Sequence, residues 1–377
     1  MDGPGGSWKR LRGQYGLGLD AWALSLAFRA MHTRTNTADV IRLPAEWEPV
    51  GAVLLAWPSA ESDWAPWLDR ARATVVAMAR AIAPRARVLV VSADPQSSHD
   101  LLADLSEHVT VIAVPLNDTW IRDYGPITIL RNQQPCLLDF GFNGWGLKFP
   151  ADRDNLVTAF LHDEGHLGQA ARLIPGLWLE GGSIESDGKG TLLTTSACLL
   201  SPNRNPHFDR AAIDGALREW LGAQRVLWLD HGHLEGDDTD AHIDTIARMC
   251  PDDTIAYVAC DDPNDSHFAD FALMAAELAA LRTAAGQPYR LVPLPWARER
   301  RAADGHRLPA TYANFLFVNG AVLVPTYADP NRDADALAAV ARACPGFAII
   351  AIDCTVLVEQ HGSLHCMTMQ IPLEIFS

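Results

Sequence analysis

The sequence is poor in basic residues, has no closely paired cysteines and contains no long apolar run. Its 30 Lys and Arg side chains stand against 46 Asp and Glu, which gives a net charge of −16. Nucleic acids and anionic membranes bind clustered Lys and Arg, so we expect neither as a partner. The absence of a window of about 18 uncharged apolar residues argues against a membrane span. A small cationic substrate would suit this charge.

The seven cysteines are odd in number, widely separated and form no Cys-x-x-Cys pair. This spacing suggests neither a disulfide framework nor a cysteine zinc site. It fits a reducing compartment, and we predict a cytoplasmic protein. Residues 1–40 are predicted to be a poorly ordered extension, in which Asp20 and several glycines argue against a signal peptide.

The rest of the chain, residues 41–377, is predicted to form a single domain of the α/β class. The chain is 49% hydrophobic and can bury a large core, and no Gly/Ser or Pro linker divides its middle. Apolar runs predict strands over 53–57, 87–91 and 109–114, and a helix beginning at Ser62-Asp63. Asn319-Gly320 predicts a hairpin between strands over 315–318 and 321–324, because the pair tolerates positive φ angles. A helix over 334–343 and a strand over 347–352 follow. The same order of elements recurs earlier, in strands over 191–200, a helix near 210–221 and a strand over 226–229.

Cys366 differs from the other cysteines in its surroundings. It follows a short turn at Gly362 and a histidine, His365, and polar residues come after it. A thiolate could be stabilised and reached by solvent there, so Cys366 is a candidate nucleophile. Taken alone, the residue could equally be a buried cysteine on a last strand. Three polar segments elsewhere in the chain favour the nucleophile.

These three segments each follow a predicted strand, and they contain acids and one histidine. If repeated modules pack around an axis, loops that leave equivalent strand ends converge on one pocket, which Cys366 would join. Each segment also has a simpler interpretation, as a surface ion pair, a turn or the start of a solvated helix. Those interpretations do not explain why the acids, the histidine and the cysteine occur together. The segments are Asn117–Pro126, Leu179–Ser183 and Gly236–Asp244.

The set of residue types fits chemistry on a guanidinium group. A guanidinium is planar and permanently charged, and its N–H donors match carboxylates two at a time. Two acids can therefore hold it flat while a thiolate attacks the central carbon and a histidine protonates the departing amine. Water then releases a urea-type product. This chemistry needs no metal and no organic cofactor.

The motifs resemble those of the agmatine deiminase and bacterial peptidylarginine deiminase family, in the guanidino-group-modifying superfamily. The likeness runs in order from about Pro44 to Pro372. It implies a five-bladed α/β propeller, a pentein, built from pseudo-fivefold ββαβ modules. It also implies hydrolysis of agmatine to N-carbamoylputrescine and ammonia, and we further expect a homodimer. Five motifs carry the likeness: Asn117–Pro126, Phe142-Asn143-Gly144-Trp145-Gly146, Glu180-Gly181-Gly182-Ser183, Gly236–Asp244 and Leu364-His365-Cys366.

Carried over to this chain, the resemblance gives each site residue a role. Cys366 is implied as the nucleophile that becomes an amidino-cysteine, and His242 as the general acid and base. Asp123 and Asp244 would hold the guanidinium. The implied substrate-binding residues are Glu180, Trp120 and Asp238, the last as a candidate for the distal amine. The segment before Cys366 departs from the family's run of glycines before Ile-His-Cys, which puts the fit of the substrate around the thiol in question.

Three alternatives remain open from the residues alone. The cluster of His and Asp over residues 231–244 contains enough ligands for a metal-dependent hydrolase. A non-catalytic binder of guanidino compounds is a second alternative. The third is a deiminase that acts on peptidyl-arginine or another guanidino compound, because these substrates share the reacting group. The lack of an export signal makes an extracellular protein substrate the weaker expectation.

Overall fold

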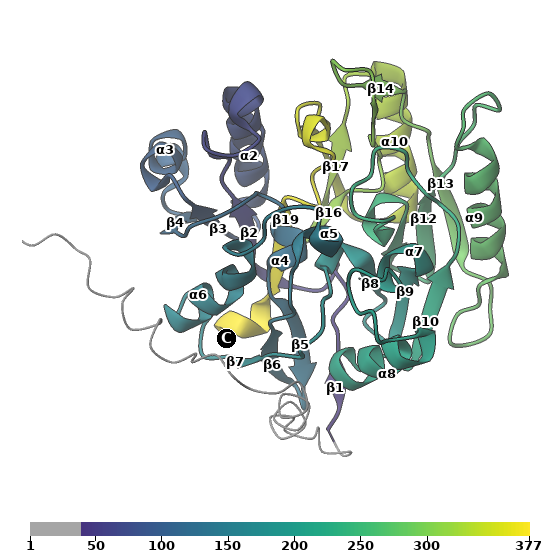
Figure 1. Ribbon diagram of the computed structural model, residues 1–377, viewed down its shortest axis with the longest axis horizontal. Helices are drawn as coiled ribbons and strands as arrows, with labels where there is room; N and C mark the ends of the chain where they lie inside the picture. Colours follow the sequence, from purple (N-terminus) through teal and green to yellow (C-terminus); the bar gives the residue numbers. More distant parts are fainter. Residues whose placement is uncertain (1–38) are drawn as a thin grey trace, which may run out of the picture. The chain divides into compact units, whose positions relative to one another are not determined.

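The computed structural model describes residues 39–377, and residues 40–377 form one compact unit (Figure 1). The extension predicted over residues 1–40 lies outside the described residues except for its last two. No helix within residues 39–377 combines the length and the apolarity that crossing a bilayer requires.

Five sheets within residues 39–377 share one order of strands, which confirms the α/β class. In each sheet an antiparallel pair is followed by a strand that runs parallel to the second member of the pair. The five sheets are β5 (Ile127–Arg131), β6 (Gln134–Leu138) and β7 (Ala171–Leu173); β8 (Ile184–Ser186), β9 (Thr191–Thr195) and β10 (Arg225–Leu229); β11 (Ala247–Cys250), β12 (Thr254–Val258) and β13 (Arg290–Leu294); β16 (Leu316–Val318), β17 (Ala321–Thr326) and β18 (Ala348–Asp353); and β19 (Thr368–Pro372), β2 (Val50–Ala56) and β3 (Arg87–Ser92).

Shorter strands complete the sheets. β1 (Ile41–Arg42) pairs with β5, and β4 (Val109–Ala113) runs parallel to β3. A separate two-stranded hairpin is formed by β14 (Arg300–Arg301) and β15 (Arg307–Leu308). The strands predicted over 53–57, 87–91 and 109–114 are therefore confirmed as β2, β3 and β4, with ends shifted by a few residues.

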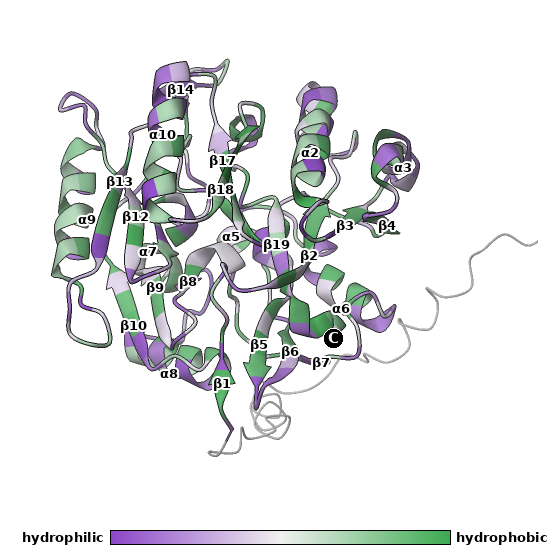
Figure 2. Ribbon diagram, turned by 180° about the vertical axis from the view of Figure 1, so that it is seen from behind, coloured by the Kyte–Doolittle hydropathy of each residue, from purple (hydrophilic) through white to green (hydrophobic). Residues whose placement is uncertain are grey.

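A helix connects the two parallel strands of each sheet and lies toward the outside of residues 40–377 (Figure 1). These helices are α6 (Val157–Asp163), α8 (Arg210–Leu221), α9 (Phe268–Ala280), α10 (Pro330–Ala343) and α2 (Leu68–Ile82). Figure 2 shows both hydrophilic and hydrophobic stretches along α2, α8 and α10, as expected for helices with one face on a sheet. The remaining α-helices are α3 (Pro95–Leu101), α4 (Ile121–Tyr124), α5 (Gly144–Leu147) and α7 (Ser196–Leu199).

Capping residues explain where the predicted helix bounds were right and where they were wrong. Helix α8 has the predicted bounds, because the Asp209 side chain accepts from the backbone N–H of Ala212 and Gly222 ends the helix at φ 71°. Helix α10 begins at Pro330 rather than 334, since Asp329 caps it. Helix α2 begins at Leu68 rather than Ser62-Asp63, because a 3-10 turn over Ala65–Trp67 precedes it.

The hairpin predicted at Asn319-Gly320 is confirmed between β16 and β17. Both turn residues have positive φ angles, 35° and 77°. The Asn319 side chain also accepts from the backbone N–H of Val50, at 2.9 Å, and so ties this turn to β2. The strand predicted over 191–200 is shorter than expected, because residues 196–199 form α7 after the Thr195 side chain caps that helix.

Candidate active site

The connection before each of the five sheets places a polar side chain close to the first strand of that sheet. The polar segments were predicted to lie just after strands. Within each connection, however, these side chains lie at the end nearest the strand that follows. Asp123, Glu180, Asp244, Asn314 and Cys366 come two to four residues before β5, β8, β11, β16 and β19, respectively. Equivalent positions in five similar modules thus supply one side chain each.

The predicted nucleophile lies in a pocket, and it is more enclosed than the sequence suggested. Cys366 is only 5% exposed and is reached through a pocket that it lines together with Trp120, Asp123 and Asp238. Its Sγ accepts a hydrogen bond from Asn314 Nδ2 at 3.3 Å and lies 3.9 Å from Asp244 Oδ2. Burial and the charges of the Asp244 and Asp123 carboxylates raise the pKa of the Cys366 thiol well above its usual value. In the empty pocket the sulfur therefore keeps its proton.

Asp244 is fully buried, and only one of its two carboxylate oxygens accepts a hydrogen bond from the described residues. Its Oδ2 accepts from His365 Nδ1 at 2.7 Å, whereas Oδ1 has no hydrogen-bond partner among the described residues. Burial opposes the charge of Asp244, but the hydrogen bond and charge of His365 outweigh it and lower the pKa of the carboxyl group. An ionised oxygen without a donor, in a site this dry, is unfavourable unless a ligand supplies the donor.

Asp123 is the second buried acid of the pocket. Its Oδ2 accepts from Trp145 Nε1 at 2.9 Å, and its Oδ1 accepts from the backbone N–H of Gly182 at 3.0 Å. Burial raises the pKa of Asp123 to about 6, although the charge of His242 opposes this shift. The Trp145 contact gives the Phe142–Gly146 motif a physical role, which is to orient this carboxylate.

His242 is completely buried and lies beside Asp123 and Glu180. Its Nδ1 is 3.7 Å from Asp123 Oδ1, and its Nε2 is 3.9 Å from Glu180 Oε2. Neither ring nitrogen has a hydrogen-bond partner among the described residues. Burial disfavours the charged ring, but the Asp123 carboxylate, the neighbouring Cys198 thiol and the Glu180 carboxylate raise the pKa of His242 to about 10. The imidazole is therefore protonated near neutral pH and can donate a proton.

Gly182 lies where the three side chains meet. A Cβ atom at this position would be 2.6 Å from His242 Nδ1, 2.9 Å from Asp123 Oδ1 and 3.0 Å from Asp244 Oδ2. No residue with a side chain fits without moving at least one of these groups. The glycine pair after Glu180 is thus needed for close approach and not only for a turn.

We expect Gly182→Ala to lower kcat/KM by roughly 100-fold, because a displacement of about 1 Å at reacting groups costs that much. The control is Gly215→Ala on the exposed face of α8, where a Cβ would meet nothing within 4 Å. Steady-state kinetics and thermal melting of both variants test this. Wild-type kinetics in a folded Gly182→Ala protein would show that the three side chains do not act together.

Glu180, which was predicted to bind the substrate, is buried and is not among the residues that line the pocket. Arg204 Nε donates to both of its carboxylate oxygens at 2.9 Å, and both side chains are buried. The Glu180 carboxylate lies behind His242, where it stabilises the imidazolium. Sequence analysis missed Arg204, which also donates to Asp240 Oδ2 at 2.6 Å.

Glu180, Cys198 and His242 are the only group in the described residues whose ligand atoms converge as a metal site would require. Three features work against a metal there. The Glu180 carboxylate already accepts from Arg204, and the raised pKa of His242 keeps its ring protonated. Burial also raises the pKa of the Cys198 thiol, which disfavours the thiolate that a metal would bind. The cluster predicted for a metal-dependent hydrolase over 231–244 does not converge. His231 Nδ1 instead contacts Glu277 Oε1 at 2.7 Å.

Trp120 and Asp238 lie toward the outer part of the pocket. The ring of Trp120 packs against Gly362, where a Cβ would come within 2.2 Å of the ring. A glycine is therefore present at the position that needs it, although the run of glycines is missing. The Asp238 side chain is 41% exposed, and its Oδ2 lies 3.6 Å from His361 Nδ1. Both residues can contact a substrate that reaches Cys366.

The chain is similar to known proteins over most of its length. The family model for Porphyromonas-type peptidyl-arginine deiminase matches residues 42–372. Agmatine deiminase from Pseudomonas aeruginosa (strain LESB58) is 32% identical over 364 residues, which covers 90% of this chain and 98% of that protein.

Two solved structures are similar over most of their length. A protein of Porphyromonas gingivalis, provisionally described as an arginine deiminase, has a TM-score of 0.84 at 49% identity and covers 88% of this chain and 98% of its own. An agmatine deiminase of C. jejuni with substrate bound has a TM-score of 0.83 at 36% identity. The match covers 89% of this chain and 97% of that protein. The chain therefore belongs to the Porphyromonas-type peptidyl-arginine deiminase and agmatine deiminase family, and it is a hydrolase acting on amidine C–N bonds.

Proposed function

We propose that this protein is an agmatine deiminase that converts agmatine and water to N-carbamoylputrescine and ammonia through an amidino-cysteine at Cys366. The observation that carries the proposal is the unpartnered Oδ1 of the buried Asp244, whose other oxygen lies 3.9 Å from the Cys366 sulfur. A guanidinium N–H is the donor that such an oxygen lacks. Asp123 would hold the other side of the cation.

Binding of the cation would itself activate the thiol. The pKa of Cys366 is raised by burial and by the charges of Asp244 and Asp123, and a guanidinium between them cancels the two charges. The thiol then loses its proton to solvent through the pocket. The thiolate attacks the central carbon of the guanidinium, and a new S–C bond replaces the C=N π bond.

His242 would complete both halves of the reaction. As the imidazolium it donates a proton to one NH₂ group, the C–N bond breaks, and ammonia leaves. The neutral ring then takes a proton from water, which attacks the amidino carbon. The S–C bond breaks, the thiolate is regenerated, and the urea product leaves. One water is consumed and one ammonia is formed in each cycle.

The outer pocket favours a substrate with a second positive charge. Asp63, Asp118, Asp237 and Asp238 line it, and none of the lining residues in the described part of the chain is Lys or Arg. The carboxylate of free arginine would meet these acids, whereas the distal ammonium of agmatine would complement them. Peptidyl-arginine would bring no charge to them.

We also propose that the five sheets are the blades of an α/β propeller. The equal order of strands in all five supports this arrangement, as does the buried polar or thiol side chain that the connection before each sheet places at an equivalent position.

Turnover of agmatine is expected to exceed that of arginine and of an Nα-acyl-arginine amide, each by at least about 10-fold in kcat/KM. Arginine brings a mismatched carboxylate and the amide lacks the distal ammonium, and either difference should cost at least about 1.4 kcal/mol. The Asp238→Asn variant should lose much of its preference for agmatine but keep its rate with pentylguanidine, which has no distal amine. Release of ureido product, followed by a colour reaction, measures all of these rates. A higher rate with the acyl-arginine amide would make the protein a peptidyl-arginine deiminase.

A further inference from the structure

A chain of short hydrogen bonds continues behind the Asp244 carboxylate, away from the substrate. Asp244 Oδ2 is 2.7 Å from His365 Nδ1, and His365 Nε2 is 2.7 Å from Glu46 Oε1. His365 is 1% exposed and Asp244 is fully buried. Neither His365 nor Glu46 has a part in the chemistry proposed above.

The far end of this chain is fixed by cations from two other segments. Glu46 Oε1 accepts from Arg122 Nη1 at 3.1 Å, and Glu46 Oε2 accepts from Arg248 Nη2 at 2.6 Å. Burial opposes the charge of Glu46, yet His365, Arg122 and Arg248 lower its pKa well below the usual value. Glu46 is therefore a fixed anion.

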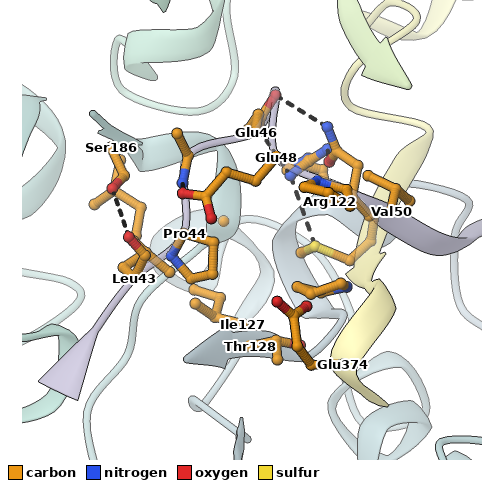
Figure 3. Close-up of a pocket in the computed structure, with 17 residues that line it drawn as sticks. Leu43, Pro44, Glu46, Glu48, Val50, Arg122, Ile127, Thr128, Ser186 and Glu374 are labelled. Atoms are coloured by element: carbon orange, nitrogen blue, oxygen red, sulfur yellow. Dashed lines mark hydrogen bonds and ion pairs between the residues drawn. The ribbon is translucent and has the colours of Figure 1, made fainter. Parts of the chain in front are cut away.

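Glu46 also lines a second pocket, which shares no lining residue with the pocket of Cys366. Figure 3 shows the Glu46 side chain beside Arg122 in this second pocket. The chain from Glu46 through His365 to Asp244 thus connects the rim of one pocket with the catalytic end of the other.

We propose that His365 is a positioning residue: its Nδ1–H holds Asp244 Oδ2, so that Oδ1 alone faces the guanidinium, and Glu46 fixes the orientation of the ring. The backbone supports this, because Asn314 Oδ1 accepts from the N–H of His365 at 2.8 Å and of Cys366 at 3.2 Å. One amide side chain therefore sets the positions of both the holder of the acid and the nucleophile.

The groups that face the ring are two carboxylates, Asp244 and Glu46, and two guanidinium groups, Arg122 and Arg248. Burial and the two arginines lower the pKa of His365, while the carboxylates oppose that shift. Arg248 Nη2 also lies 3.1 Å from Nε2. Positioning requires a proton on Nδ1, which lies in the contact with Asp244. Nε2 donates to Glu46 Oε1 when the ring is doubly protonated, and in the neutral ring it accepts from Arg248 Nη2, which Glu46 Oε2 holds.

Two amide substitutions separate the two ends of the ring. The amide nitrogen of Asn can take the place of Nδ1, and that of Gln the place of Nε2. His365→Asn therefore keeps a donor to Asp244, and His365→Gln keeps only the contact with Glu46. We expect His365→Gln to lower kcat/KM by about 100-fold, because Asp244 would lose its donor and shift by about 1 Å. In His365→Asn the donor remains, the shift should be smaller, and the loss should be no more than about 10-fold.

The proposal rests on the role of Asp244 in the proposed function, so a readout independent of turnover is needed. Alkylation of Cys366 by chloroacetamidine requires the carboxylates to hold a cation, whereas alkylation by the neutral chloroacetamide does not. The ratio of the two rates should fall about 10-fold or more in His365→Gln and stay near wild type in His365→Asn. The ratio for Glu46→Gln should lie between those of the two His365 variants. Glu48→Gln is the matched control from the same second pocket, because Glu48 pairs with Arg42 and not with His365.

The outcomes are distinguishable. A wild-type protein without preference for the cationic reagent would contradict the proposed function itself. A preserved preference in His365→Gln, or in Glu46→Gln if the histidine variants do not fold, would overturn the positioning role. Equal losses in both His365 variants, with equal losses in melting temperature, would also overturn it, because they would indicate a role in folding alone.

Discussion

Cys366→Ala is expected to reduce turnover of agmatine by at least about 10⁴-fold, the scale of removing a nucleophile from a catalytic set that acts as a unit. The pocket offers no replacement thiol, since the groups beside the sulfur are the amide of Asn314 and the carboxylate of Asp244. Ammonia release measures the loss. The matched control is Cys260→Ala, because Cys260 is partly exposed and outside the pocket, and its rate should equal that of wild type.

The same variant should still bind the substrate, because Asp123 and Asp244 remain. Calorimetric titration with agmatine tests this, and a mass spectrum of wild-type protein quenched during turnover tests the covalent step. An amidino group on the peptide that contains Cys366 is expected. An appreciable residual rate in Cys366→Ala would exclude covalent catalysis by this thiol.

His242→Asn is expected to lower kcat by about 10³-fold, within the usual contribution of a general acid and base. The variant cannot protonate the leaving amine, and it cannot activate water in the second half of the reaction. Because the pKa of His242 is raised to about 10, the acid form is present below that pH and is lost as pH rises through it. The kcat/KM of the wild type should therefore fall at pH above about 10.

The pH profile also has an acid side. The raised pKa of the Cys366 thiol means that kcat/KM should increase with pH until the thiolate forms readily in the complex. The alkaline fall should be absent in His242→Asn, whereas the acid side should remain. An alkaline fall of the same size in the variant would assign it to another group and remove His242 from the proton transfers.

Much of the fold could be predicted from short stretches of sequence. The Asn319-Gly320 turn and the bounds of α8 follow from single residues with strong backbone or capping preferences. The starts of α2 and α10 were wrong, because a 3-10 turn and the cap at Asp329 moved them. The motif residues at the site were predicted because each belongs to a dense polar segment in an apolar chain.

His365 was named only as the neighbour of Cys366, whereas Asn314 and Arg204 were missed for a different reason. Each acts through contacts with residues distant in sequence, and nothing beside them in the sequence marks their role. Asn314 could have been found from the module order, because it precedes β16 as Cys366 precedes β19. Arg204 could not, since its partners Glu180 and Asp240 come from two separate connections. The pairing of Glu180 with Arg204 is likewise invisible in the sequence.

The strand that follows Cys366, β19, pairs antiparallel with β2, so the sheet beneath the nucleophile joins the two ends of the described chain. Residues from both ends must be present before the sulfur has its place. Neither strand can build this sheet alone, since β2 and β19 come from opposite ends of the described residues. The position of the reactive sulfur therefore depends on long-range pairing and not on the local sequence around Cys366.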